Sequence, residues 1–320
     1  MYKKFYGFKE RPFEIAPDPA FVYLSEVHQE ALAHLQYAIQ EGKGFSVITG
    51  EAGTGKTTLV RKLLSNIDGS SIRTCYIFNP IMDSTDFLNY ICNDLGIESD
   101  GIKSRGQSLT ALHNYLLQCF TKNEKVFLII DEAQSLETNL LQEVRLLTNL
   151  ETAKYKLLHV ILLGQPELNQ TLSEPRFRPL KQRITIRYHL RPLTLKESKE
   201  YITYRLKRAG SRDLAIFDNS AIKEIFRYSK GIPRLINIVG DNALLTGFSR
   251  DKNRIGKNII QSAIRDIEIK EKSSWSQKSK SFLQAFIILL LLVCVSCGLL
   301  YLLYFWESFD NVCNFSFFKF

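Results

Sequence analysis

Outside one apolar segment, the sequence lacks the paired cysteine spacing that marks a disulfide framework or a zinc site. Three of its six cysteines, Cys75, Cys92 and Cys119, are scattered along the N-terminal part. This argues against a small disulfide-stapled domain, and we expect the N-terminal part to lie in a reducing compartment. An apolar signal-peptide core is also missing at the start, where Met1–Lys4 leads into polar and aromatic residues. A cleaved export signal is therefore not expected.

Acidic residues are fewer than basic ones, 33 against 42, which gives a formal net charge of +9 at pH 7. Nucleic acid, an anionic lipid surface and a phosphate-bearing ligand all favour such a surplus, so charge alone does not choose among these partners. The length of 320 residues exceeds that of one typical domain. It predicts a large domain together with a smaller one.

A phosphate-binding loop is the most specific pattern that is present. Residues Gly50–Thr57 match G-x-x-x-x-G-K-[ST] without a mismatch, directly after the apolar run Phe45–Thr49. Glycines let backbone N–H groups surround a phosphate, Lys56 supplies charge to the outer phosphates, and Thr57 offers a hydroxyl to Mg²⁺. A helix from Lys56 onward would point its positive dipole end at the same anion. A glycine-rich turn without a ligand is the alternative, and the complete pattern in this setting favours a nucleotide site.

Short β-rich runs alternate with helical patterns up to about Leu190, which predicts a parallel sheet covered by helices on both faces. The expected strands are Phe45–Thr49, Ile72–Phe78, Val126–Ile130, Leu157–Leu163 and Ile184–Tyr188. The expected helices between them are Ser84–Leu95, Ser108–Phe120 and Thr138–Leu150, with a polar loop over Asp100–Gly106. Helical patterns alone follow Pro192, so a small all-helical domain is expected there. These patterns cover Leu195–Ala209, Ser220–Tyr228 and Arg234–Gly247.

Two adjacent carboxylates follow the run Val126–Ile130, at the C-terminal end of a strand, where ligands bind in open α/β sheets. Asp131 is expected to hold Mg²⁺ together with Thr57, and Glu132 to polarise the water that attacks the γ-phosphate. Two acidic residues that cap the next helix are the alternative. The preceding phosphate loop favours ATP hydrolysis over binding alone. The residues predicted to bind the nucleotide are Gly50, Glu51, Ala52, Gly53, Thr54, Gly55, Lys56, Thr57, Thr58 and Asp131.

Two further residues are candidates for contact with the γ-phosphate region. Gln165 follows the next apolar run, where it could orient the attacking water or could instead cap a helix or form a turn. In the small domain, Gly231–Arg234 stands between two helical patterns, and Pro233 favours a helix start. Arg234 in that first turn could fold back onto the phosphates.

Six basic residues surround the last expected strand. They are Arg176, Arg178, Lys181, Arg183, Arg187 and Arg191. A solvated face, a nucleic-acid patch, and an arginine finger projected into a neighbouring subunit's ATP site are three competing interpretations. The ATPase core favours the finger, with Arg183 as first choice and Arg178 as second.

The apolar run Phe282–Phe305 holds no charged residue and is long enough to cross a hydrocarbon core of roughly 30 Å. Cys294 and Cys297 lie inside it without a nearby histidine, aspartate or second cysteine pair, so a membrane helix is favoured over a metal site. A buried helix of a soluble protein is the alternative. Four lysines precede the run and Lys319 alone follows it, which places the N-terminal part in the cytoplasm.

Several motifs together carry a family resemblance. They are Gly50–Thr58, Ile130–Gln134, Gly164–Leu168, Gln182–Ile184 and Gly231–Asn237. The N-terminal Phe5–Phe8, Pro12–Phe13, Pro17–Pro19 and His28–Leu32 add to it. The set resembles AAA+ ATPases, and more narrowly the ExeA/GspA family of bacterial secretion ATPases and the related MshM-type pilus-biogenesis ATPases. The likeness covers about residues 2–265 and the apolar run.

The resemblance implies a P-loop NTPase sheet followed by a small helical lid and a C-terminal transmembrane helix. In that scheme Arg234 is the sensor-2 arginine, Gln165 the sensor-1 residue and Arg183 a candidate finger. The implied domains are an N-terminal segment of the nucleotide pocket (1–40), the AAA+ core (41–190), the lid (191–268), a basic linker (269–281), the transmembrane helix (282–305) and a short periplasmic tail (306–320).

The resemblance also implies partners and a location. Family members form ATP-dependent oligomers at the bacterial inner membrane and, with a GspB-like partner, help a secretin channel to form in the cell wall. We therefore expect a single-pass homo-oligomer with its ATPase domain in the cytoplasm. ExeA-type proteins carry a periplasmic peptidoglycan-binding domain after the membrane helix, but only residues 306–320 follow here. Direct peptidoglycan binding by this chain is thus not expected, and a shorter MshM-like role and a truncated family member are the two interpretations.

A DNA-associated ATPase of the transposition or replication-initiation type is the rival hypothesis, because it shares the core motifs and the chain is basic. The apolar run argues against it, and no reader domain of sufficient length follows the small helical domain. A nucleotide-dependent scaffold without fast turnover is a third hypothesis, which the intact Lys56, Asp131 and Glu132 disfavour. The leading hypothesis is a membrane-anchored ATPase that uses Mg²⁺ and ATP to drive assembly of an envelope secretion or pilus complex.

Overall fold

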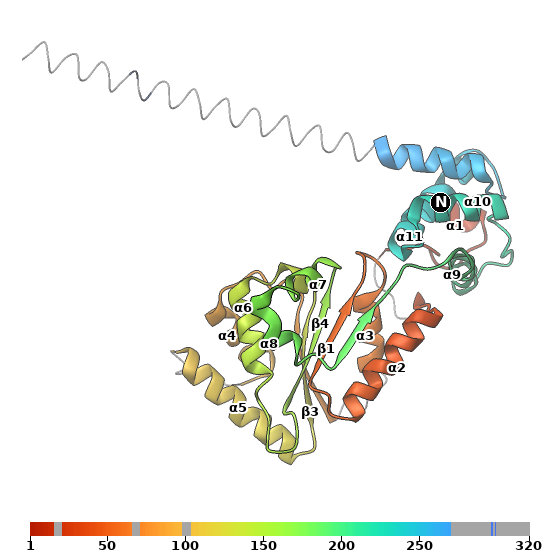
Figure 1. Cartoon of the computed structure of the whole chain (residues 1–320). Helices are drawn as coiled ribbons and strands as arrows, with labels where there is room; N and C mark the ends of the chain where they lie inside the picture. Colours follow the sequence, from red (N-terminus) through yellow and green to blue (C-terminus); the bar gives the residue numbers. More distant parts are fainter. Residues whose placement is uncertain (16–20, 66–70, 98–103, 270–295, 297, 299–320) are drawn as a thin grey trace, which may run out of the picture. The chain divides into compact units, whose positions relative to one another are not determined.

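The computed structural model describes residues 1–15, 21–65, 71–97, 104–269, 296 and 298 (Figure 1). The chain divides into two units, Met1–Gln261 and Ser262–Phe320. The first unit contains the sheet and the site predicted from the sequence.

A five-stranded parallel sheet forms the centre of the first unit, in the order β2-β3-β4-β1-β5. Its strands are β1 (Phe45–Thr49), β2 (Ile72–Ile77), β3 (Lys125–Ile130), β4 (Leu158–Gly164) and β5 (Ile186–His189). The inner strands are largely apolar and buried along nearly their whole length, as expected for a parallel sheet that is covered on both faces. This arrangement confirms the predicted α/β class.

Alternate residues of each inner strand pack into two separate cores. Ile48 and Ile129 join one core together with α2 (Glu26–Gln40) and α3 (Lys56–Ser65). Val47 and Leu128 join the other, against α4 (Ser84–Asp94), α5 (Arg105–Thr121) and α6 (Thr138–Leu147). Figure 1 shows these two groups of helices on opposite faces of the sheet. Because the strand period is two, one apolar run supplies both cores.

Helices follow the last strand, as the sequence predicts. They are α9 (Leu195–Arg208), α10 (Asn219–Ser229) and α11 (Pro233–Ser249), and residues 257–269 are also helical. A capping box between Thr194 and Glu197 begins α9, and Asp218 caps α10. The boundaries 190/191 and 268/269 of the proposed lid stay predictions.

The N-terminal residues pack on this helical part. Tyr2, in the short helix α1 (Tyr2–Phe5), donates a hydrogen bond to Asp241 of α11. The Arg205 guanidinium of α9 donates to the carbonyl oxygens of Pro12 (2.5 Å) and Glu14 (2.9 Å). The first residues of the chain are thereby fastened to α9 and α11.

Some predicted element boundaries were wrong. Helix α5 begins at Arg105, inside the predicted loop Asp100–Gly106, because the Ser104 side chain accepts a hydrogen bond from the Gln107 backbone and caps the helix early. Helix α6 ends at Leu147 instead of Leu150, and β5 begins at Ile186 instead of Ile184.

The predicted membrane segment cannot be compared in the same way. Among the described residues no helix is both long and apolar enough to span a bilayer. The predicted span 282–305, except 296 and 298, lies outside the described residues, and so do 270–281 and 306–320. Cys294 and Cys297 also lie outside them.

Candidate active site

The predicted phosphate loop connects the end of β1 to the start of α3, and its glycines are required by close contacts. A Cβ atom on Gly50 would lie 2.6 Å from the Leu190 carbonyl oxygen. Gly53 has a φ of +84°, and a Cβ there would lie 2.6 Å from Cβ of Arg234. Gly55 has a φ of +102° and is packed against His28. At Gly53 and Gly55 a left-handed backbone is combined with missing side-chain space, whereas at Gly50 the close contact alone excludes a side chain.

Lys56, the first residue of α3, folds back into the loop. Its Nζ donates to the carbonyl oxygens of Gly50 (2.7 Å) and Glu51 (3.1 Å). Burial lowers the pKa of this lysine from its ordinary value, and the carboxylates of Glu132 and Asp131 oppose that effect. The ammonium is therefore partly desolvated, and the negative charge of a bound phosphate would offset that cost.

Asp131 is buried directly after β3, and its carboxylate accepts three hydrogen bonds. Oδ2 accepts from the hydroxyls of Thr57 (2.6 Å) and Tyr76 (3.0 Å), and Oδ1 accepts from the Glu132 backbone (2.9 Å). The structure thus brings together the two predicted Mg²⁺ ligands from α3 and β3. A hydroxyl and a carboxylate are hard oxygen donors, so this pair fits Mg²⁺.

Tyr76 of β2 was not predicted from the sequence. Burial, followed by the neighbouring Asp131 charge, raises the pKa of its hydroxyl, which stays protonated and donates. Tyr76 lies on the edge strand beside β3, so only the strand order reveals that it reaches Asp131.

The side chains of Glu132 and Gln165 are joined by a hydrogen bond. The Gln165 Nε2 donates to Oε2 of Glu132 at 3.3 Å. Gln134, which sequence reasoning assigned no role, donates through Nε2 to the same Oε2 at 2.5 Å. Helix α7 (Glu167–Thr171) has Pro166 at its N-cap and no side-chain cap, so the Gln165 side chain does not cap that helix. The Gln165 backbone does form a turn, because its carbonyl accepts a hydrogen bond from the Leu168 N–H at 3.0 Å.

Arg234 lies against the phosphate loop, although it is far away in sequence. Helix α11 begins at Pro233, and the Arg234 backbone N–H donates to the Gly53 carbonyl at 3.4 Å. Gly231 makes this approach possible, because it has a φ of +80° and its carbonyl accepts from the Leu193 backbone at 2.9 Å. The geometry therefore places the first turn of α11 beside the loop that the sequence predicts to hold ATP.

His28 of α2 also contacts the phosphate loop, and the sequence did not reveal this contact. Its Nε2 lies 2.9 Å from the Thr54 carbonyl oxygen, and its Nδ1 lies 2.7 Å from Oγ of Ser25. Because a carbonyl can only accept, Nε2 carries the proton. Burial lowers the pKa of His28, which favours the neutral ring. The motif His28–Leu32 was noted, but no sequence pattern indicates that it reaches the loop.

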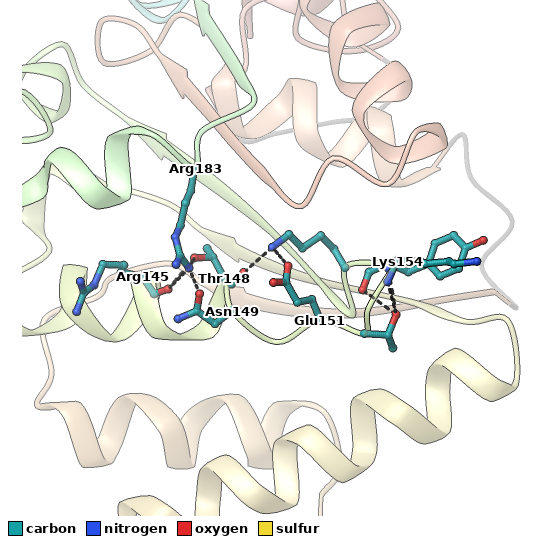
Figure 2. A network of polar contacts seen from close by, with 9 residues as sticks. Arg145, Thr148, Asn149, Glu151, Lys154 and Arg183 are labelled. Carbon is teal, nitrogen blue, oxygen red and sulfur yellow. Dashed lines mark hydrogen bonds and ion pairs between the residues drawn. The ribbon is translucent and has the colours of Figure 1, made fainter.

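Arg183 lies near the opposite ends of the strands from the phosphate loop. It precedes β5, whose first residue, Ile186, pairs with Ser46 near the start of β1, whereas the phosphate loop follows the end of β1. Figure 2 shows its guanidinium at the C-terminal end of α6, where Nη1 donates to the Arg145 carbonyl (3.1 Å) and to Oγ1 of Thr148 (2.9 Å). Arg183 thus does not join the site of its own chain. A finger role requires a neighbouring copy and stays a prediction.

Comparisons with known proteins match the ATPase domain and the fold. The model of the AAA domain family matches residues 39–172. General secretion pathway protein A of Aeromonas hydrophila is 42% identical over 278 residues, which cover 86% of this chain and 50% of that protein. The chain thus spans half the length of this relative.

Two solved structures share the fold. The ORC2 protein of Aeropyrum pernix matches with a TM-score of 0.60 and 17% identity, over 81% of this chain and 72% of that one. Cdc6p of Pyrobaculum aerophilum matches with a TM-score of 0.60 and 18% identity, over 78% and 71%. With the phosphate loop and its carboxylates in place on this fold, the matched AAA domain and the identity to the secretion protein confirm the predicted resemblance of this chain to the ExeA/GspA family of AAA+ ATPases.

Proposed function

We propose that this ATPase hydrolyses ATP with Mg²⁺ to drive assembly of a bacterial envelope secretion or pilus complex, from a position anchored in the inner membrane. The observation that carries the hydrolytic part is the convergence of Thr57, Asp131, Glu132 and Gln165, linked by hydrogen bonds at the ends of β3 and β4. Ligands of parallel α/β sheets bind at these carboxyl ends of the strands.

Each side chain has a role in this proposal. The loop N–H groups and Lys56 bind the phosphates. Thr57 and Asp131 hold Mg²⁺, which when bound supplies positive charge to the phosphate oxygens. Glu132 accepts a proton from the attacking water, and Gln165 orients that water from the neighbouring strand. Arg234 adds positive charge beside the loop. Because it belongs to the first turn of α11, it links nucleotide binding in the loop to the position of that helix.

The assembly role rests on the identity to general secretion pathway protein A. Membrane anchoring rests on the uncharged apolar run Phe282–Phe305 and the lysines that precede it. We further propose a homo-oligomer with a GspB-like, pilus or secretin partner.

The experiment is to purify full-length Glu132→Gln protein from membranes in the presence of ATP and to identify what is retained with it. A stalled ATP state should keep its partner, whereas Lys56→Ala, which cannot hold ATP, is the matched control. Secretin, pilus or GspB-like proteins found with Glu132→Gln but absent with Lys56→Ala would support the proposal. Recovery of DNA with replication or transposition proteins would contradict it.

A further inference from the structure

We infer that Gln134 is a positioning residue for hydrolysis, which fixes the Glu132 carboxylate and binds it to the end of β4. The inference rests on the proposed function, because it assumes that Glu132 activates water. Gln134 lies in the 3₁₀ turn η3 (Ala133–Ser135), directly after Glu132.

Both ends of the Gln134 amide are used. Its Nε2 donates to Oε2 of Glu132 at 2.5 Å, and its Oε1 accepts from the backbone N–H of Gln165 at 2.9 Å. A carboxylate accepts only and a backbone N–H donates only, so a residue between them must supply one donor and one acceptor. Glutamine does so, while glutamate lacks the donor and leucine lacks both.

Glu132 needs such support because little else restrains it. Its side chain is exposed, it makes no capping bond to η3, and its backbone is left-handed with a φ of 50°. A left-handed conformation at a residue other than glycine is strained and persists only where the surroundings impose it. The amides of Gln134 and Gln165 restrict the carboxylate to one orientation.

Both amide donors bond to the same oxygen, Oε2 of Glu132. This assigns Oε1 as the oxygen that takes the proton from the attacking water. Gln134 also lies close to Gly164, where a Cβ atom would be 3.4 Å from Oε1 of Gln134 and 2.6 Å from Cδ2 of Leu168.

The Gln134 side chain links the Gln165 backbone to the Glu132 carboxylate. A displacement of Gln165 by the γ-phosphate would therefore be passed through Gln134 to the carboxylate that performs the chemistry.

The test compares full-length Gln134→Leu and Gln134→Glu with wild type. Hydrogen bonds to a charged group are strong, so kcat should fall by about ten- to 100-fold in both. The Kd of a non-hydrolysable ATP analogue should stay close to the wild-type value, because the hydrogen bonds of the Gln134 side chain go to Glu132 and Gln165 and not to the phosphate loop. The exposed Gln170 of α7 offers a matched control, and Gln170→Leu should keep the wild-type kcat. Unchanged kcat in Gln134→Leu, or an equal loss of ATP binding, would overturn the inference.

A double-mutant cycle separates positioning from a structural role. In single-turnover measurements, Gln134→Leu should slow the residual reaction of Glu132→Gln by less than about twofold, because no carboxylate remains to be positioned. A tenfold further loss would show that Gln134 acts independently of Glu132. If Glu132→Gln itself keeps wild-type turnover, the base assignment of the proposed function fails. If Glu132→Gln is inactive and Gln134→Leu is normal, only the present inference fails.

Discussion

A methyl group at Gly53 tests how closely the first turn of α11 approaches the phosphate loop. In Gly53→Ala the added Cβ would lie 2.6 Å from Cβ of Arg234 and 3.4 Å from Cγ2 of Ile232. Carbon atoms in contact are ordinarily about 3.5–4.0 Å apart, so α11 or the loop must move by about 1 Å. The φ of +84° adds a backbone cost of about 1–2 kcal/mol for any residue with a side chain.

Gly96→Ala separates these two effects. Gly96 has a φ of +72°, but its Cβ would meet no atom within 4 Å. Both variants should therefore lose about 1–2 kcal/mol in the free energy of unfolding from the backbone conformation, and Gly53→Ala should lose more because its Cβ also meets Arg234, as measured by chemical denaturation. Only Gly53→Ala should also weaken ATP binding, by at least about tenfold, or about 1.4 kcal/mol, in a titration with a fluorescent ATP analogue. Wild-type ATP affinity in Gly53→Ala would refute the contact between Arg234 and the loop.

Two other predictions concern Arg183 and the buried His159. Arg183→Ala should leave nucleotide affinity intact and lower hydrolysis only in the assembled state, and an equal loss at high dilution would argue against a finger that acts on a neighbour. Burial lowers the pKa of His159 from 6.5 to about 4, so the unfolded chain takes up its proton first and stability falls as pH drops through that window. Urea denaturation should show a loss of about 2 kcal/mol between pH 7 and pH 5, with His28 acting in the same direction, and a pH dependence that His159→Leu does not flatten would contradict the assignment.

Much of the fold and the centre of the site could be predicted because their signals are local. The phosphate loop, the apolar strands and the carboxylates after β3 each lie within a few consecutive residues. The sequence pattern predicted helix ends least reliably, because a single capping residue such as Ser104 can shift the start of a helix, as it does for α5. Local signals therefore identify elements better than they identify their boundaries.

The remaining site contacts could not be predicted, because they depend on tertiary structure. Tyr76 reaches Asp131 only because β2 lies beside β3, and His28 reaches Thr54 only because α2 packs next to α3. Similarly, nothing in the sequence around Arg183 indicates that it meets the end of α6. Charge and position near a strand made Arg183 a candidate, whereas its contacts are set by the arrangement of the sheet and α6.

The measurement that tests the central claim most directly is ATP binding and ATP turnover of Glu132→Gln in the same preparation. The substitution keeps the size of the side chain and removes the carboxylate that would accept the proton. The account predicts an ATP Kd within about twofold of wild type and a kcat lower by at least about 100-fold. Turnover at the wild-type rate would show that Glu132 is not the residue that activates water.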